Sequence, residues 1–379
     1  QGGSGSVVNQ GAITASDGGY VALLGLDVKN QGIIVAQRGT VALAAGNAAT
    51  LDMHGDGMFH LAVDPATVAA SAANHHLIQA DGGQVIMAAR TAADLAGTVV
   101  NSGVIRARSI REHNGIIRLE AGTGVVSHSG SLDASGVQPG QTGGTIKVLG
   151  DRVAFDGAAR IDASGQSGGG TILIGGNWQG QGPEQNATTT YVGQDATILA
   201  DAHVQGNGGT VVVWANDTAE FHGQISAKGG LQQGDGGQAE VSGKQRLIYQ
   251  GGTDLRASNG QTGSLLLDPA NYTIAASGGD ITGAALGAQL GLANVTISSN
   301  QGQAGTDGDI FVNDSITWNN ANTLTLNAYR NIAVNAAVNP GTNANVILRA
   351  DQTGTGTGTV SFGGSGTIAR KGGGVSIYY

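Results

Sequence analysis

The hexapeptide Gly144-Thr-Ile-Lys-Val-Leu149 decides the fold, because it returns four more times along the chain. Its copies are Gly170-Thr-Ile-Leu-Ile-Gly175, Gly209-Thr-Val-Val-Val-Trp214, Gly237-Gln-Ala-Glu-Val-Ser242 and Gly263-Ser-Leu-Leu-Leu-Asp268. They begin at positions 144, 170, 209, 237 and 263, so the steps are 26, 39, 28 and 26 residues. A recurring period of this length is typical of a solenoid, in which each repeat stacks on its neighbours.

One repeat divides into three short strand patterns joined by turns that contain glycine or asparagine. They are Thr145–Leu149, Arg152–Phe155 and residues 159–163. Three strands per turn of about 26 residues predict an all-β fold, a right-handed parallel β-helix in which each coil pairs with the next. A β-sandwich is the alternative, but it needs antiparallel hairpins and does not predict this long period. The one long step contains residues 177–194, which we interpret as an insertion loop.

Shorter repeats precede this region. Val8-Asn9-Gln10-Gly11-Ala12-Ile13 is echoed by Val28-Lys29-Asn30-Gln31-Gly32-Ile33 and by Val100-Asn101-Ser102-Gly103-Val104-Ile105. Stacked asparagines at equivalent corners can form a hydrogen-bonded ladder. We therefore expect Asn9, Asn30 and Asn101 to belong to such a ladder.

Two segments carry helix signals. Residues 64–73 begin with Asp64-Pro65, an N-cap followed by proline at the first helical position, and continue with small residues. Residues 282–290 are a second candidate. We expect one or two short helical excursions from the solenoid at these places.

Alternation along the strands predicts which side chains point inward. The inward set is Ile146, Val148, Ile172, Ile174, Val211, Val213, Ala239, Val241, Leu265 and Leu267; the outward set is Lys147, Leu149, Leu173, Val212, Trp214, Glu240 and Leu266. Stacking brings Leu149, Leu173, Val212 and Trp214, here called the outer strip, into one candidate binding surface. A contiguous apolar strip usually has a partner. Either another molecule binds it, or the insertion at residues 177–194 folds over it.

Composition excludes several classes of protein. Glycine makes up 67 of 379 residues, far above the usual share of about 7%, yet 40% of residues are hydrophobic, which excludes a disordered chain. The chain has 18 basic and 27 acidic residues, a net charge of −9 and no basic block, so nucleic acid and anionic membranes are poor partners. It has no cysteine and no apolar run long enough to span a membrane. The start, Gln1-Gly-Gly-Ser-Gly, falls within the pattern, so we expect an internal piece or a processed form.

The search for enzyme and metal sites yields weak candidates only. Asp133 and Asp162 occupy matching Asp-Ala-Ser-Gly phrases and could stack as a carboxylate pair, but the same phrase reads as a corner turn. Histidines lack zinc-site spacing, and we interpret His75-His76 as a solvated turn near a helix end. Asp307-Gly-Asp309 with Asp314 suggests calcium, but the repeat that binds calcium in β-helices is missing. We predict no enzyme activity, no cofactor and no metal.

Five sequons provide candidate glycosylation sites. Their asparagines are Asn186, Asn216, Asn271, Asn294 and Asn313. Such tripeptides also arise by chance in a chain rich in asparagine and threonine.

Several phrases together resemble one known family. They are Asn9-Gln-Gly-Ala-Ile-Thr-Ala-Ser-Asp-Gly-Gly-Tyr-Val-Ala-Leu-Leu24, Gly39-Thr-Val-Ala-Leu-Ala-Ala-Gly46 with Leu51-Asp52 and Val63-Asp-Pro65, Gly236-Gly-Gln-Ala-Glu-Val-Ser-Gly-Lys244, and Leu265-Leu-Leu-Asp-Pro269. The chain resembles the filamentous-haemagglutinin-like exoproteins of two-partner secretion, which are large adhesins. The likeness runs from about residue 5 to 274 and more loosely to Tyr379. The family's early Asn-Pro-Asn type motif, associated with recognition by the outer-membrane transporter, is absent.

The resemblance implies a division of the chain. Residues 1–128 would be the C-terminal part of a secretion-type β-helix domain, 129–274 regular repeats of about 26 residues, and 275–379 a further solenoid continuation. The implied function is a secreted stalk on the surface of a Gram-negative cell that mediates attachment, aggregation or biofilm formation. The implied partners are the outer-membrane transporter (through an intact secretion domain, incomplete here), host-cell or matrix glycans or proteins, and other copies of the chain. The alternatives are a polysaccharide-binding biofilm matrix module and the stalk of a contact-dependent toxin-delivery protein.

Overall fold

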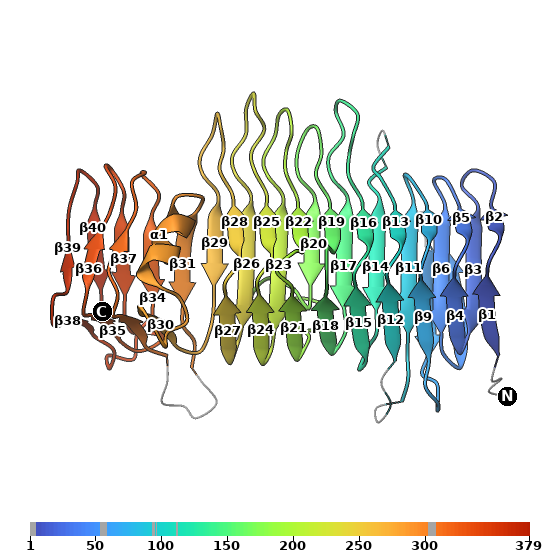
Figure 1. Cartoon of the computed structure of the whole chain (residues 1–379), viewed down its shortest axis with the longest axis horizontal. Coiled ribbons are helices and arrows are strands. Elements are labelled where there is room, and N and C mark those ends of the chain that lie inside the picture. The colour runs from blue at the N-terminus through green and yellow to red at the C-terminus, as the bar shows by residue number, and fades with distance from the viewer. Residues whose placement is uncertain (1–4, 54–58, 93–94, 96, 111–112, 302–307) are drawn as a thin grey trace.

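The chain winds into a parallel β-helix whose coils stack along one axis (Figure 1). The computed structural model describes residues 5–53, 59–92, 95, 97–110, 113–301 and 308–379. Each early coil contributes one strand to each of three sheets, here called A, B and C. Every pair of neighbouring strands in these three sheets is parallel, so the predicted fold class is confirmed and the β-sandwich is excluded.

Sheets A and B each contain nine strands. Sheet A consists of β1 (Ser6–Asn9), β4 (Asp27–Asn30), β9 (Ser71–Asn74), β12 (Thr98–Asn101), β15 (Val125–His128), β18 (Arg152–Phe155), β21 (Thr189–Val192), β24 (Thr218–Phe221) and β27 (Arg246–Tyr249). Sheet B consists of β2 (Ala12–Thr14), β5 (Ile33–Val35), β10 (Leu77–Gln79), β13 (Val104–Arg106), β16 (Ser131–Asp133), β19 (Arg160–Asp162), β22 (Thr197–Leu199), β25 (Gln224–Ser226) and β28 (Gly252–Asp254).

Sheet C has 13 strands and continues through the whole solenoid. It consists of β3 (Tyr20–Gly25), β6 (Thr40–Ala45), β11 (Gln84–Ala89), β14 (Ile116–Glu120), β17 (Thr145–Leu149), β20 (Thr171–Ile174), β23 (Thr210–Ala215), β26 (Gln238–Gly243), β29 (Ser264–Leu267), β31 (Asn294–Ser298), β34 (Leu324–Asn327), β37 (Val346–Arg349) and β40 (Val375–Tyr378).

Equivalent residues of successive sequence repeats pair with each other in neighbouring strands. Thr145 pairs with Thr171, Thr171 with Thr210, and Thr210 with Gln238, so each recurrence of the hexapeptide is one coil of sheet C. The ten side chains predicted to point inward are all fully buried: Ile146, Val148, Ile172, Ile174, Val211, Val213, Ala239, Val241, Leu265 and Leu267. The core is therefore one continuous apolar column along the axis.

A ladder of buried amides runs beside this core. The Asn9 side chain donates to Asn30 Oδ1, Asn30 to Asn74 and Asn74 to Asn101, each over 2.8 Å. The predicted ladder is confirmed, with Asn74 as an additional rung. His128 continues it, since its Nδ1 lies 3.1 Å from Asn101 Nδ2. Burial lowers the His128 pKa to about 4, so the ring is neutral at physiological pH.

The architecture changes after β28, where sheets A and B end and the helix α1 (Gly283–Leu290) follows. Beyond it, sheet C is accompanied by a four-stranded and a three-stranded sheet. Their strands are β30 (Tyr272–Ile274), β32 (Ile310–Val312), β35 (Ile332–Val334) and β38 (Val360–Phe362), and β33 (Ile316–Thr317), β36 (Ala337–Asn339) and β39 (Thr367–Ile368). Among the described residues, no helix is long and apolar enough to cross a membrane. The division of the chain at residues 128 and 274 stays a prediction.

The predicted helix at residues 282–290 is confirmed as α1, with the Thr282 hydroxyl accepting from Ala285 N–H over 3.1 Å. This helix covers the last strand of sheet B. The Gln289 side chain donates to Thr253 O over 2.6 Å and accepts from Thr253 N–H over 3.0 Å. It also accepts from the Tyr249 hydroxyl over 2.9 Å. The Gln289 amide thus satisfies the backbone groups that the next strand would otherwise pair.

The predicted helix at residues 64–73 is wrong. β8 ends at Asp64 and Ser71–Asn74 is β9, a regular strand of sheet A. The backbone between them is bonded to the next coil, because Ala66 N–H donates to Arg90 O over 3.0 Å. Ala72 is fully buried between neighbouring coils. Pairing with both neighbouring coils outweighs the local Asp-Pro signal, which acts over one turn only.

In the described part of the chain, two excursions leave the solenoid after strands of sheet C. The first is an antiparallel hairpin of β7 (Ala48–Met53) and β8 (Phe59–Asp64). The second, here called the flap, comprises residues 176–186 and includes the 3-10 turn η1 (Trp178–Gly180). The flap is shorter than the predicted insertion at residues 177–194, because Thr189–Val192 forms β21 within sheet A. Its ends meet where Ala187 N–H donates to Gly175 O over 2.7 Å, so the coil resumes its path as though the flap were absent.

Candidate functional site

The outer strip lies where the sequence placed it, on the outer face of sheet C, outside the central core. Leu173 and Val212 are register partners in β20 and β23, and Trp214 lies two positions further along β23. Leu149, Val212 and Trp214 are nevertheless buried, with Val212 and Trp214 only 0% and 4% exposed, and Leu173 is half-buried. Of the two alternatives, this burial favours a strip that is covered within the chain, and binding of another molecule at the strip stays a prediction.

The flap covers Trp214. Gly176 and Gly180 lie against the Trp214 ring so closely that a Cβ on Gly180 would come within 2.4 Å of its Cζ2 atom. The Trp214 indole N–H donates to Asn216 Oδ1 over 3.1 Å. Only glycine permits this approach, and Gly180 also has a positive φ of 64°. The alternative that the insertion folds over the strip agrees with this packing.

Polar contacts hold the flap at both ends of the strip. Glu184 accepts from the Lys147 amine over 2.5 Å and forms an ion pair with Arg118 over 3.4 Å. At the other end, Gln179 N–H donates to Glu240 Oε2 over 2.7 Å. A lysine and a glutamate that face outward from sheet C thus anchor the flap.

Glu240 has an unusual environment for a carboxyl group. It is fully buried, and burial raises its pKa to about 7, with a smaller contribution from the nearby Asp268 charge. Burial likewise raises the pKa of Asp268 to about 6. Both carboxyl groups thus have raised pKa values, and Glu240 lies where Gln179 of the flap contacts sheet C. Alternation along the strand places Glu240 on the outer face, but nothing in the sequence pattern indicates its raised pKa.

Asp133 and Asp162 are stacked one coil apart, as their matching phrases suggested. Asp133 accepts from Arg108 over 2.7 Å and from the Ser135 hydroxyl over 2.6 Å. Asp162 accepts from Arg160 over 2.7 Å and from Ser164 N–H over 2.9 Å. Both carboxylates are thus used in corner turns and ion pairs, which supports the structural interpretation of the phrase.

The candidate metal ligands are dispersed or occupied. His75 and His76 form an exposed turn between two strands, as interpreted, although no helix adjoins them. Asp309 binds Arg330 and Asp314 accepts from Gly283 N–H over 2.8 Å, while Asp307 lies outside the described residues. Among the residues that the structure describes, no group of three or more histidine and acidic side chains could hold a metal ion.

The five sequon asparagines differ in accessibility. Asn216, Asn271 and Asn313 are exposed, whereas Asn186 and Asn294 are half-buried. The Asn186 amide nitrogen donates to Gly180 O over 2.7 Å inside the flap, and that of Asn294 to Thr262 O over 2.7 Å. Glycosylation stays a prediction, and these contacts favour the three exposed asparagines as acceptors.

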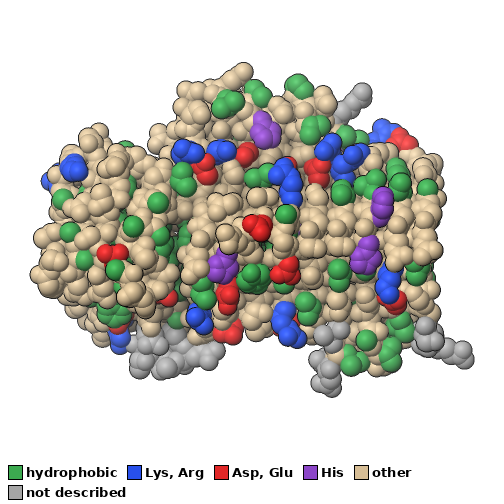
Figure 2. Space-filling model, viewed as in Figure 1, with side chains coloured by type: hydrophobic (Ala, Val, Ile, Leu, Met, Phe, Trp, Pro, Cys, Tyr) green, Lys and Arg blue, Asp and Glu red, His purple; other side chains and the backbone are tan. Residues whose placement is uncertain are grey.

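A feature that the sequence did not suggest is a row of ion pairs along sheet B. Basic and acidic side chains gather beneath the loops that rise from the coils (Figure 2). The pairs are Arg106–Asp81, Arg108–Asp133, Arg160–Asp162, Lys228–Asp201 and Arg256–Asp254. Each acid faces a base on its own or a neighbouring coil, so the row is close to neutral.

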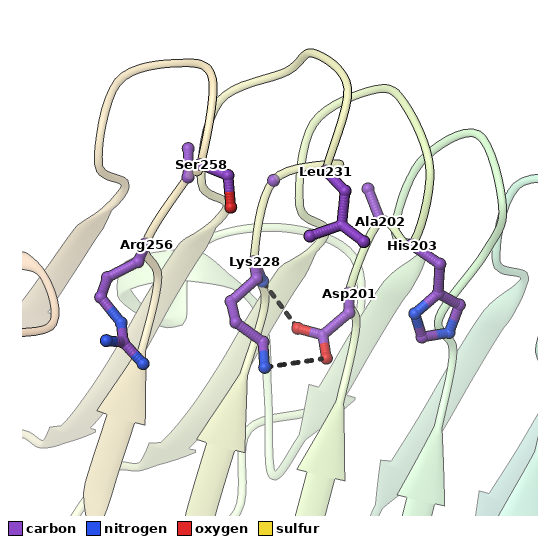
Figure 3. A pocket seen from close by; sticks show the side chains of 9 residues that line it. Asp201, Ala202, His203, Lys228, Leu231, Arg256 and Ser258 are labelled. Carbon is purple, nitrogen blue, oxygen red and sulfur yellow. Dashed lines mark hydrogen bonds and ion pairs between the residues drawn. The ribbon is translucent and has the colours of Figure 1, made fainter.

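At one end of this row the loops after β22, β25 and β28 border an open hollow of about 520 Å³. Figure 3 shows His203, Leu231, Lys228 and Arg256 around it, contributed by three successive coils. Asp201 accepts from Lys228 N–H over 2.7 Å, and its other oxygen lies 3.8 Å from the Lys228 amine. Volumes of this order are typical of small-ligand sites. The hollow is the candidate binding site of this chain.

Comparisons with known proteins show a similarity to a solved structure. No known protein family matches the sequence, and no curated protein does. Among solved structures, the chain is similar to the HMW1 secretion domain from Haemophilus influenzae, with 29% identity and a TM-score of 0.57. The match covers 69% of this chain and 66% of that one, just under two thirds of its length. The similarity supports the β-helical fold and a resemblance to a secretion domain.

Proposed function

We propose that this chain is part of an exoprotein exported by two-partner secretion, and that its solenoid serves as an adhesive stalk on the surface of a Gram-negative cell. The observation that carries the proposal is the similarity of the chain to the HMW1 secretion domain. Family phrases such as Gly236-Gly-Gln-Ala-Glu-Val-Ser-Gly-Lys244 point the same way. On this proposal, the outer-membrane transporter is the export partner.

The architecture supports the role of a stalk. Sheet C links 13 coils by main-chain hydrogen bonds, so bending the rod would require breaking a ladder of parallel pairs. A stiff rod can present many weak contacts at once, and multivalency converts these into strong attachment. Filamentous haemagglutinin-like adhesion, aggregation and biofilm formation are the functions that this mechanism suits.

The test separates export from adhesion. Antibodies against this chain would be applied to intact cells of the source bacterium and to a strain without the two-partner transporter. We expect surface or medium signal in the first and loss of that signal in the second. Deletion of the exoprotein should then reduce attachment to epithelial cells or growth as a biofilm. Unchanged export without the transporter would refute the secretion proposal; transporter-dependent export with unchanged attachment would refute adhesion alone.

A second candidate function is polysaccharide binding within a biofilm matrix. The hollow beside Lys228 and Arg256 favours it, because it offers cationic and polar groups to a ligand. The stalk of a toxin-delivery protein gains no comparable support from the described residues.

A further inference from the structure

The hollow is a departure from the coil repeat. Ser135, Ser164, Asp201, Lys228 and Arg256 occupy equivalent corner positions, each two residues beyond a register-matched strand residue in successive coils. Asp81 and Arg108 hold the same position in the two preceding coils, so Arg108 is a single cation between an acid and a serine. Lys228 and Arg256 follow, and they place two cations on adjacent coils about 4.8 Å apart. The fold does not need this pair, since the serine-containing corners adopt the same backbone path.

Polar groups around the hollow retain hydrogen-bonding capacity. The Lys228 amine has its acidic partner at 3.8 Å, beyond hydrogen-bond length. Arg256 uses Nε and Nη2 on Asp254, over 2.9 and 2.7 Å, which leaves Nη1 without an acceptor among the described residues. Among the described residues, the Ser258 hydroxyl and the His203 ring also form no hydrogen bond, and both side chains line the hollow. These groups can therefore form hydrogen bonds with a ligand.

The backbone around the hollow is already paired. Ala202 N–H donates to Lys228 O over 2.8 Å, and Gly229 N–H donates to Arg256 O over 3.0 Å. A peptide could therefore not add a strand here. The Asp201 carboxylate also lines the hollow, but it already accepts from the Ser226 hydroxyl over 2.6 Å and from Lys228 N–H over 2.7 Å. The other groups are two cations, a hydroxyl, an imidazole and one aliphatic side chain, Leu231, which is 68% exposed. This combination suits a sugar that carries a carboxylate.

We propose that the hollow binds the uronic-acid unit of an acidic polysaccharide. The sugar carboxylate lies between Lys228 and Arg256, where charge-assisted hydrogen bonds are strongest. Ser258 and His203 receive the ring hydroxyls, and Leu231 packs against the apolar face of the ring. The inference rests on the proposed function only for its biological role, because a surface-displayed rod meets such polymers outside the cell.

The experiment uses the purified chain with sodium D-glucuronate as the probe, followed by saturation-transfer NMR and titration. We expect saturable binding with a Kd on the order of 1 mM. Lys228→Gln combined with Arg256→Gln should weaken binding at least about tenfold. Leu231→Ala should weaken it severalfold with an unchanged melting temperature, which separates a lost contact from a lost fold. Arg160→Gln is the matched control, since Arg160 belongs to the same row and pairs with Asp162 outside the hollow.

Several outcomes would overturn the site. Equal binding of D-glucose would show that the carboxylate is not recognised, and equal binding of acetate would show that the sugar is not. Equal binding of an acidic peptide would reduce the hollow to a general anion patch. The same loss in Arg160→Gln would point to the overall charge of the row instead. Because the assay needs neither export nor attachment, its failure leaves the proposed secretion and adhesion intact.

Discussion

Replacing Trp214 with alanine should detach the flap. Trp214 is 4% exposed, and its ring lies against Gly176 and Gly180 of the flap. A buried tryptophan covers roughly 150–250 Å², and its truncation in a core costs about 3–5 kcal/mol. The flap can open to relieve the cavity, so we expect about 3 kcal/mol, close to the lower limit.

The loss should be local, because each coil is stabilised mainly by its neighbours. Hydrogen exchange and limited proteolysis of Trp214→Ala should expose the flap, residues 176–186, while the Asn9–Asn101 ladder keeps its protection. Trp214→Phe is the control, since it retains most of the apolar area and loses the hydrogen bond to Asn216, a cost of about 1 kcal/mol.

Gly180→Ala provides an independent route to the same state, because its Cβ would clash with Trp214. If the flap is the partner of Trp214, the two substitutions should not add in the double variant. The reasoning fails if Trp214→Ala leaves flap exchange, proteolysis and melting temperature all unchanged.

The remaining predictions concern pH, the junction at α1 and the open edge of sheet C. Because burial raises the Glu240 pKa from 4.5 to about 7, the protein should lose stability as pH rises from about 4.5 through 7, by up to roughly 3 kcal/mol. Glu240→Gln should flatten that dependence in thermal melts between pH 4 and 8, and an equally steep profile would contradict it. Gln289→Leu should cost about 3 kcal/mol by leaving the Thr253 backbone groups unpaired, seen as faster hydrogen exchange in β28; unchanged exchange there would count against the role of Gln289. The chain should associate with increasing concentration through β40, whose outer edge pairs with no other described strand. Ile377→Lys should reduce this association in sedimentation velocity, whereas a monomeric profile for the unaltered chain at high concentration would disprove it.

The strands could be predicted from the sequence because, in a β-helix, the spacing of the repeats equals the separation of paired residues along the chain. Thr145, Thr171 and Thr210 are successive register partners, and their positions in the sequence already give the steps of 26 and 39 residues. Alternation then determines which side chains enter the core. The Asn74 rung was missed because the β7–β8 hairpin separates it from Asn30 by 44 residues, well beyond the spacing of the other rungs.

Local sequence patterns do not predict features that depend on packing between coils. Asp64-Pro65 is a sound local helix signal, but Ala72 and Ala73 lie in β9, and pairing with two neighbouring coils determines their conformation. Alternation likewise assigned Trp214 to the outer face without revealing that the flap covers it. Aligning the residues after Ala200, Ala227 and Leu255 as equivalent corners would have revealed the adjacent cations Lys228 and Arg256.

The location of the candidate site follows from the nature of a repeat fold. Every coil repeats nearly the same backbone path, so the inward positions are restricted to side chains that fit the core, and only the outward positions and loops can vary freely. Ion pairs such as Arg160–Asp162 within β19 satisfy the outward positions without creating a binding site. A binding site therefore requires that neighbouring coils carry other side chains at these outward positions. Among the described coils, Lys228 and Arg256 are the place where two successive corners do so beside an open hollow. At the outer strip, in contrast, the flap of the same chain covers the apolar side chain of Trp214. We therefore expect ligand binding at the hollow and not at the outer strip.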